Sequence, residues 1–499
     1  MTRYRHLITD DNRKWWTLGA MCFALFMVML DNTVVNVALP SIQRDLHAQI
    51  SDLEWIVNGY TLTFAVLIAT GGRLGDIFGR RRMFLTGVVI FAVTSATAGL
   101  AQDSSMLIAS RAVQGIGAAL MMPATLSIVT HAFPASERGK AIGTWAGVSA
   151  LALSIGPVVG GFLTEHVSWR AIFFINLPVA VGAVIATVFA VRESRDDTVE
   201  RRVDYPGVVA LTAGLTAVVL ALIEGNSWGW SSPQIIALLV GGAVALAAFV
   251  AIELRARAPM VEFGLFKTRQ FIGSNIVAFI ITFAMMGSFF FMALYMQDVL
   301  GYGALEAGVR FLPTTMVIAV VAPLSGRLAD RLGPVWPMSA GLAILSVSMF
   351  MFSRIDVSTT YSGLIVPFVL MGIGIALVMS PMSTAAMNAV SVQKAGVASG
   401  VLQMSRMIGG TVGVAATGAI FQSQLGSGFD PASLVGAPEQ AQAIFVDALS
   451  SAMLLAAGVV VLGFVVAVAL LRGARAKRPG EASKRREGAA NATPAAEAG

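Results

Sequence analysis

Long apolar runs, separated by short polar and basic loops, divide this sequence into fourteen segments. Each run holds about 20 mostly apolar residues, the length a helix needs to cross the hydrocarbon core of a bilayer. The pattern therefore predicts an all-α membrane protein with fourteen spanning helices. We place them at 16–39, 53–71, 83–101, 106–129, 140–163, 171–191, 204–223, 234–254, 271–294, 305–325, 335–353, 362–385, 396–420 and 445–471.

Composition supports an integral membrane protein. The chain is 56% hydrophobic and only 12% charged, whereas soluble domains carry about 25% charged residues. The net charge of +6 could indicate a nucleic-acid partner, but the basic residues lie in loops between the apolar runs, so we expect none. The single cysteine, Cys22, excludes an intrachain disulfide.

The distribution of basic residues predicts the orientation. With residues 1–15 in the cytoplasm, all but six of the 34 Lys and Arg residues lie in or beside cytoplasmic segments, as the positive-inside rule requires. Both termini are then cytoplasmic, and the polar tail 473–499 is expected to be disordered. The hydrophilic start leads into a full-length span, so we expect no cleaved signal peptide.

The chain repeats itself at long range. Gly72-Arg-Leu-Gly-Asp-Ile-Phe-Gly79 returns at 326–333, offset by 254, and Gly115-Ile-Gly-Ala-Ala-Leu-Met-Met122 returns at 372–379, offset by 257. Segments one to six (16–191) therefore correspond to segments nine to fourteen (271–471), and segments seven and eight (204–254) are an insert. Parallel repeats with a site at their interface are typical of secondary transporters that alternate between two openings.

Two charged residues stand out within the spans. Asp31 lies in the first segment, and a charge at the bilayer centre costs several kcal/mol, so such residues usually serve as proton relays or ion sites. Arg111 in the fourth segment lies at the same depth, roughly 10 Å from the outer surface by helical rise. An Asp31–Arg111 interaction is therefore geometrically feasible. It can serve proton exchange or be a permanent structural ion pair.

Two further motifs have both a mechanical and a packing interpretation. In Gly72-Arg-Leu-Gly-Asp-Ile-Phe-Gly-Arg-Arg-Arg82, Asp76 can pair with Arg80 and satisfy N–H groups at a neighbouring helix N-terminus. A simple positive-inside anchor is the alternative. In Ser154-Ile-Gly-Pro-Val-Val-Gly-Gly161, with Gly143 and Gly147 upstream, small residues four apart favour close helix contacts, and Pro157 permits a bend.

These motifs, with Leu30-Asp-Asn-Thr-Val-Val-Asn-Val-Ala-Leu-Pro40, resemble the major facilitator superfamily. Within it they are similar to the 14-helix drug:proton antiporters, the EmrB/QacA-like multidrug exporters. The resemblance implies two six-helix bundles plus two extra helices, with Asp31 as the protonation site. It also implies a conformational latch formed by Gly72, Asp76, Gly79, Arg80 and Arg81, and an antiporter signature formed by Gly147, Gly156, Pro157, Gly160 and Gly161.

Five polar side chains are candidates for the substrate cavity: Asn36, Asn58, Tyr60, Gln114 and Arg406. Ordinary packing is an equally good interpretation of Asn58, Tyr60 and Gln114. Arg406 has no evident acidic partner. If it faces the cavity it favours neutral or anionic substrates, and otherwise it bonds helix carbonyls.

The sequence lacks a phosphate-binding loop, so ATP is not expected as the energy source. The four histidines form no metal-ligand or catalytic arrangement, so we expect no cofactor, no metal and no enzyme. The prediction is proton-driven efflux of amphipathic organic compounds by a monomer in the cytoplasmic membrane, among lipids. Alternatives are a dedicated exporter of one metabolite or antibiotic, or a translocator of lipid or cell-envelope precursors. A periplasmic adaptor is expected only if the host has an outer membrane.

Overall fold

The computed structural model describes residues 9, 12–134, 137–195, 203–256, 259–390, 394–425, 434 and 438–471. In this part of the chain thirteen helical stretches are long and apolar enough to cross a membrane by length and composition. The one predicted segment not among them, 396–420, is also a helix, α15, but Arg406 and several polar residues lower its hydropathy. The all-α prediction is confirmed. The predicted tail 473–499 and most of 1–15 lie outside the described residues.

The first half contains six spans. Its helices are α1 (Arg13–Leu46), α2 (Ile50–Phe78), α3 (Arg80–Gly99), α4 (Ser104–Ala132), α5 (Arg138–His166), α6 (Ala171–Phe174) and α7 (Asn176–Ala190). The sixth predicted span is divided into α6 and α7 at Ile175. α1 is the central helix, because it packs against α4, α5 and α7.

The insert and the second half complete the bundle. The insert is α8 (Tyr205–Trp228) and α9 (Pro233–Glu253), followed by the 3-10 turn η1 (Phe263–Lys267). The second half is α10 (Arg269–Leu294), the π-helical turn η2 (Tyr295–Val299), α11 (Ala304–Arg310), α12 (Leu312–Leu332), α13 (Val335–Phe352), α14 (Tyr361–Asn388), α15 (Ala395–Leu425) and α16 (Glu439–Leu471). The tenth predicted span is broken at Phe311, next to Pro313.

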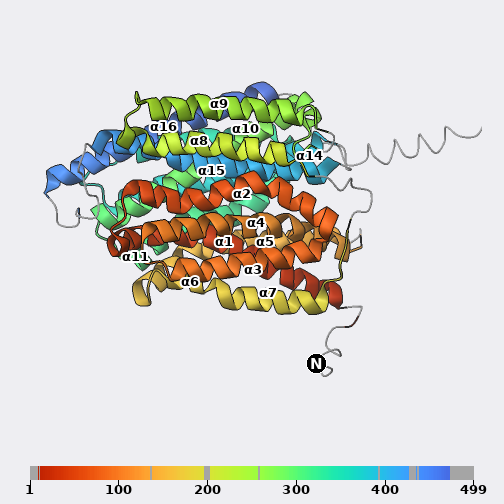
Figure 1. The fold of residues 1–499 in the computed structure, drawn as a ribbon. Coiled ribbons are helices and arrows are strands. Elements are labelled where there is room, and N and C mark those ends of the chain that lie inside the picture. The colour runs from red at the N-terminus through yellow and green to blue at the C-terminus, as the bar shows by residue number, and fades with distance from the viewer. Residues whose placement is uncertain are drawn as a thin grey trace, which may run out of the picture.

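All spans run side by side in the same general direction (Figure 1). The first half and the second half lie next to each other, and α8 and α9 lie along the side of the bundle where α15 and α16 run. α8 contacts α2 and α15, so it touches both halves, whereas α9 packs mainly on α8. We call the end with the start of α1 and the basic loop 79–82 the basic end, and the opposite end the far end.

The two halves meet at the far end. Gln297 of η2 donates to the Val37 carbonyl of α1 at 2.8 Å. The Glu165 carboxylate of α5 accepts from the Leu305 N–H of α11 at 2.8 Å. Deeper in the bundle, the Ser154 hydroxyl donates to the Thr315 carbonyl at 3.2 Å. These contacts join α1 and α5 to α11 and α12.

The basic end is open by comparison. Residues 142–144 and 146–147 of α5 are exposed around the whole circumference of the helix. A Cβ added at Gly143 or Gly147 would meet nothing within 4 Å. Leu324, Leu328 and Leu332 of α12 are likewise exposed. The structure is therefore closed at the far end, with the basic-end parts of α5 and α12 uncovered.

Candidate functional site

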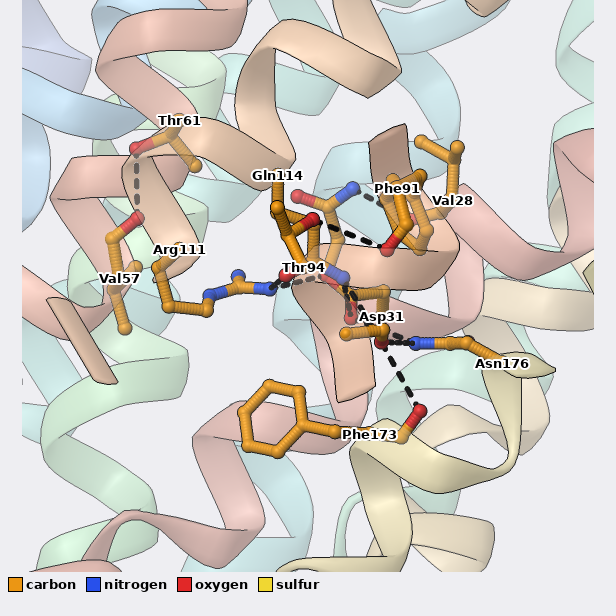
Figure 2. Close-up of polar contacts among 12 residues, drawn as sticks. Val28, Asp31, Val57, Thr61, Phe91, Thr94, Arg111, Gln114, Phe173 and Asn176 are labelled. Carbon is orange, nitrogen blue, oxygen red and sulfur yellow. Dashed lines mark hydrogen bonds and ion pairs between the residues drawn. The ribbon is translucent and has the colours of Figure 1, made fainter. Parts of the chain in front are cut away.

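Asp31 and Arg111 form a buried ion pair at the centre of the first half (Figure 2). The Arg111 guanidinium donates to Asp31 Oδ2 at 2.5 Å. Asp31 is 1% exposed and Arg111 is 2% exposed. The contact expected from their equal depth in α1 and α4 is therefore present.

Two amides complete the shell of the carboxylate. Gln114, one turn after Arg111, donates to Asp31 Oδ1 at 3.2 Å and accepts from Arg111 at 2.7 Å. Asn176, the first residue of α7, also donates to Asp31 Oδ1 at 3.2 Å. Both amides contact the Ser95 hydroxyl of α3, which itself donates to the Phe173 carbonyl. Four helices and the α6–α7 junction therefore position one carboxylate (Figure 2).

Arg111 is held on its other side by aromatic rings and the backbone. Its Nε donates to the Ile56 carbonyl of α2 at 3.2 Å. Its guanidinium carbon lies 4.3 Å from the centre of the Tyr60 ring and 5.8 Å from that of Phe173. A cation on an aromatic face gains electrostatic energy without a second anion. Arg111 therefore keeps favourable contacts when the charge of its Asp31 partner changes.

This arrangement is suited to proton exchange. A carboxylate with three donors is stabilised in the charged form, whereas burial in an apolar bundle favours the neutral form. Ligand binding or water entry that changes either contribution can load or release a proton. Removing the charge of Asp31 would leave Arg111 as the only charge of the pair, which costs free energy in a buried site.

Of the other predicted cavity residues, Tyr60 and Gln114 belong to this site, but Asn36, Asn58 and Arg406 do not. Asn36 donates to the Asn32 carbonyl of its own helix. Asn58 is fully buried, and neither atom of its amide has a hydrogen-bond partner among the described residues.

Arg406 lies on the side of α15 that meets α10. The next turns of α15, Gly409 and Gly413, touch the α10 backbone, and the Arg406 carbonyl accepts from Thr282 of α10. Its guanidinium donates to Gln403 at 3.3 Å. In the described part of the chain it forms no ion pair. Thr411, which faces the first half, is about 140° away around the helix.

The loop at the basic end holds its own ion pair. Arg80 donates to Asp76 at 2.8 Å, the pairing the sequence suggests. The predicted capping of a neighbouring helix by Asp76 stays a prediction, because no such contact is found among the described residues. Instead Glu193, after α7, accepts from the backbone N–H groups of Arg81 and Arg82 at the start of α3.

Gly72 lies inside α2, which continues to Phe78, whereas Gly79 is the single residue between α2 and α3. A Cβ at Gly79, where φ is +112°, would lie 2.6 Å from the Glu193 carboxyl carbon. A Cβ at Gly72 would lie 3.4 Å from Pro123 of α4. Gly79 therefore gives the backbone its left-handed φ and leaves room for Glu193.

The α5 motif is divided between two partners. Gly156 and Gly160 pack on α1, where a Cβ at Gly160 would lie 2.8 Å from Val34 Cα. Gly161 and the Pro157 carbonyl meet α11 of the second half. The expectation of close contact at Gly147 is wrong for this structure, because it lies on the open basic-end part of α5.

Asn176, Ser95 and Glu193 were missed by the sequence analysis. Asn176 is a polar residue within an otherwise apolar segment, a signal similar to that of Asp31. Ser95 and Glu193 have no distinguishing pattern. Among the described residues no group of three or more His, Cys, Asp or Glu side chains could hold a metal ion.

Comparison with known proteins gives matches over most of the chain. Residues 21–414 match the family model of the Major Facilitator Superfamily. The tetracenomycin C resistance and export protein of Streptomyces glaucescens is 36% identical over 84% of this chain and 78% of its own length. The multidrug resistance protein Stp of Mycobacterium tuberculosis is 37% identical over 83% and 77%. The puromycin resistance protein pur8 of Streptomyces alboniger is 35% identical over 92% of both.

Solved structures show the same fold. The POT family transporter PepTSo has a TM-score of 0.66 at 15% identity, covering 93% of this chain and 99% of that one. A bacterial homologue of the human lysosomal transporter Spinster has a TM-score of 0.64 at 17% identity, covering 92% and 97%.

Proposed function

We propose, since this chain belongs to the major facilitator superfamily and its relatives include antibiotic and multidrug exporters, that it exports amphipathic organic compounds in exchange for protons. The observation that carries the proposal is the Asp31–Arg111 pair, buried in a bundle closed at the far end. In this proposal the protein is a transporter rather than an enzyme, and the site binds a proton rather than a cofactor.

The orientation follows from the basic loops. The basic end faces the cytoplasm, both termini lie there, and the far end faces the outside of the cytoplasmic membrane. The structure then corresponds to a state open to the cytoplasm. In this state Asp31 is ionised and paired with Arg111, which is the form left after the proton is released inward and the form that binds substrate.

The cycle takes one proton and one substrate in opposite directions. Substrate enters from the cytoplasm between the halves, and the bundle then closes at the basic end and opens at the far end. Outside, Asp31 binds a proton, Arg111 keeps its contacts with Tyr60 and Ile56, and substrate leaves. Return to the cytoplasmic opening restores the ion pair and releases the proton. Each proton contributes about 2.3 kcal/mol per 100 mV of membrane potential.

The remaining features of the proposal concern partners. Membrane lipids surround the apolar faces, and the chain acts as a monomer. A periplasmic adaptor joins it only in a host with an outer membrane. The α2–α3 junction, Gly72–Arg81, with the Asp76–Arg80 pair, is proposed to form the latch at the cytoplasmic end when that end closes.

A second candidate is the dedicated export of one metabolite or antibiotic. Several relatives favour it, because they are named for resistance to or export of a single antibiotic: tetracenomycin C, puromycin or cephamycin. The chemistry at Asp31 is the same in both candidates. Only the breadth of substrates differs.

Transport by liposomes reconstituted with the full chain tests the proposal. We expect uphill movement of puromycin or ethidium when a pH gradient is imposed, and none without the gradient. Asp31→Asn should remove the response to the gradient while leaving the protein folded. Movement that ignores the gradient in the unchanged protein would contradict proton coupling. A panel of compounds distinguishes broad from narrow specificity.

A further inference from the structure

Another buried carboxyl group, Glu54, lies where the two halves meet. Glu54, Asn58 and Thr61 of α2 are spaced i, i+4 and i+7, so they share one face of the helix. That face meets Thr411, Gly418 and Gln422 of α15, which follow the same kind of spacing. We call these six residues the seam.

The seam joins the halves by polar contacts away from water. Thr411 donates to the Thr61 hydroxyl at 2.9 Å, and Gln422 donates to Glu54 Oε1 at 2.8 Å. The Glu54 carboxyl lies directly on Gly418, where a side chain would collide with it. The seam therefore requires α2 and α15 to be in close contact, as they are when the far end is closed.

Glu54 is fully buried and incompletely satisfied. It is 0% exposed, and its second oxygen, Oε2, has no hydrogen-bond partner among the described residues. The neighbouring Asn58 amide is equally buried and unpaired. Polar groups left unpaired in an apolar interior cost free energy. Opening the seam to water would satisfy them, so they favour opening, and a charged Glu54 favours it most.

No cation compensates Glu54 in the described residues. Its electrostatic neighbour is Glu224 of α8, which carries like charge and accepts from Ser227. Among the described residues of α15, the side chain that hydrogen-bonds to it is the Gln422 amide. The other charged groups and histidines on the helices that pack against α2 are Arg13, Lys14, Asp31, Arg44 and Asp45 of α1, Arg80, Arg81 and Arg82 of α3, Arg111 and His131 of α4 with Asp103 at its N-cap, Arg406 of α15, and Asp52, Arg73 and Asp76 of α2 itself.

These charged groups have other partners or lie at the opposite end of the bundle. Arg111 pairs with Asp31, and Asp52 accepts from the Gln49 N–H at the start of α2. The basic residues of α3 lie at the opposite end of the bundle. An ionised carboxylate without a partner in such a place normally becomes neutral instead.

We propose that Glu54 is a second proton-binding site, which controls closure of the far end. When the far end closes, Glu54 takes a proton from the outside medium and enters the seam as a neutral carboxylic acid. When the far end opens, the acid returns that proton to the same medium. No proton crosses the membrane through Glu54, so the exchange ratio set by Asp31 is unchanged. Acid outside favours closure.

This inference rests on the alternating openings of the proposed function but not on proton coupling at Asp31. The two carboxyl groups therefore have different signatures. Neutralising Asp31 removes the response of transport to a pH gradient. Neutralising Glu54 removes the response of the far-end opening to pH, and substrate-linked proton release persists.

The test measures that opening directly. Spin labels are placed on the full chain at Ser51 of α2 and Ser423 of α15, in a background where the single cysteine is replaced, Cys22→Ser. Distances are recorded by pulsed electron spin resonance in lipid nanodiscs between about pH 5 and about pH 9. We expect the ratio of long to short distances to rise with pH, by up to about tenfold per pH unit for one linked proton.

Three variants make the result specific. Glu54→Gln should stay in the short-distance state across the pH range, whereas Glu54→Asp, which keeps the acid, should restore the pH dependence. Glu224→Gln, the matched neutralisation of the acid that interacts electrostatically with Glu54, should retain it, as should Asp31→Asn. An unchanged pH dependence in Glu54→Gln overturns the proposal. So does a far-end distance that is independent of pH in the labelled parent.

Discussion

The two halves of the chain are repeats of each other, yet their centres are chemically different. At the repeat offsets of 254 and 257, Asp31, Arg111 and Gln114 correspond to Met285, Phe368 and Met371. The first three form a buried, hydrogen-bonded charge network. The second three are buried apolar residues.

Phe368 belongs to an aromatic cluster in the second half. Its ring lies 5.4 Å from that of Phe311 and 5.1 Å from that of Phe352. Such pairs stabilise packing without any charge. A buried ion pair is a weak source of stability compared with apolar packing. The same fold could hold apolar residues at the centre of both halves, yet it holds charged residues at the centre of the first half. This supports a functional role for the charged residues of the first half.

Removing the Arg111 cation should cause the largest loss of transport and stability among the variants that test this comparison. In Arg111→Met the Asp31 carboxylate loses its partner, and breaking a buried pair in this way costs about 3–5 kcal/mol. We expect lost transport and a large fall in thermal stability, measured by scanning fluorimetry and liposome transport. The double variant Asp31→Asn/Arg111→Met should recover most of the stability but no proton-driven transport. No recovery would mean that the two residues are not a coupled pair.

Asn176 tests the part of the network that comes from α7. Asn176→Ala removes a donor to the charged Asp31 and to Ser95, and hydrogen bonds to charged groups are worth about 1.5–3 kcal/mol. We predict slower transport and a shift in its pH dependence, measured as initial rates over a range of pH. A profile identical to that of the parent would remove Asn176 from the site.

The corresponding change in the second half should be milder. Phe368→Leu replaces one apolar residue by another, and such exchanges usually cost less than about 1.5 kcal/mol. Stability should fall slightly, and the ratio of protons to substrate should not change. Loss of coupling as complete as in Arg111→Met would show that the halves share the proton chemistry.

The smallest effect is expected at the basic-end loop. Asp76–Arg80 is partly exposed, and ion pairs of this kind contribute about 0–1 kcal/mol. In the second half the repeat aligns Asp330 with Asp76 and Pro334 with Arg80. Pro334 has no charge and cannot form the corresponding ion pair. Arg80→Ala should therefore leave thermal stability nearly unchanged but slow transport, if the loop acts as a latch when the cytoplasmic end closes. Unchanged transport would leave only an anchoring role.

Much of the fold could be predicted from the sequence, because the length of each apolar run fixes a spanning helix. The Asp31–Arg111 contact could be predicted as well, since both depth and charge restrict its partners. Asn176 could not, because its position depends on the junction between α6 and α7. Glu193 and Glu54 act across loops or between halves, which no local pattern records.

The open end of the bundle could not be predicted for a different reason. Both openings must be accessible to a chain that alternates, so their free energies are close. The motif around Gly147 is consistent with close packing, yet this structure leaves it uncovered. A pattern of small residues describes a contact that can form and does not say in which state it forms.

Proton release on substrate binding tests the central claim most directly. The purified protein, in detergent and a weak buffer with a pH indicator, is mixed with a compound that the liposome panel shows to be exported. In the proposed cycle substrate binds the form with ionised Asp31, so binding draws molecules with protonated Asp31 into that form. We therefore predict acidification when the compound binds to the unchanged protein at a pH where both forms are present, and binding without acidification in Asp31→Asn. Binding to the unchanged protein without any change in pH would contradict the account.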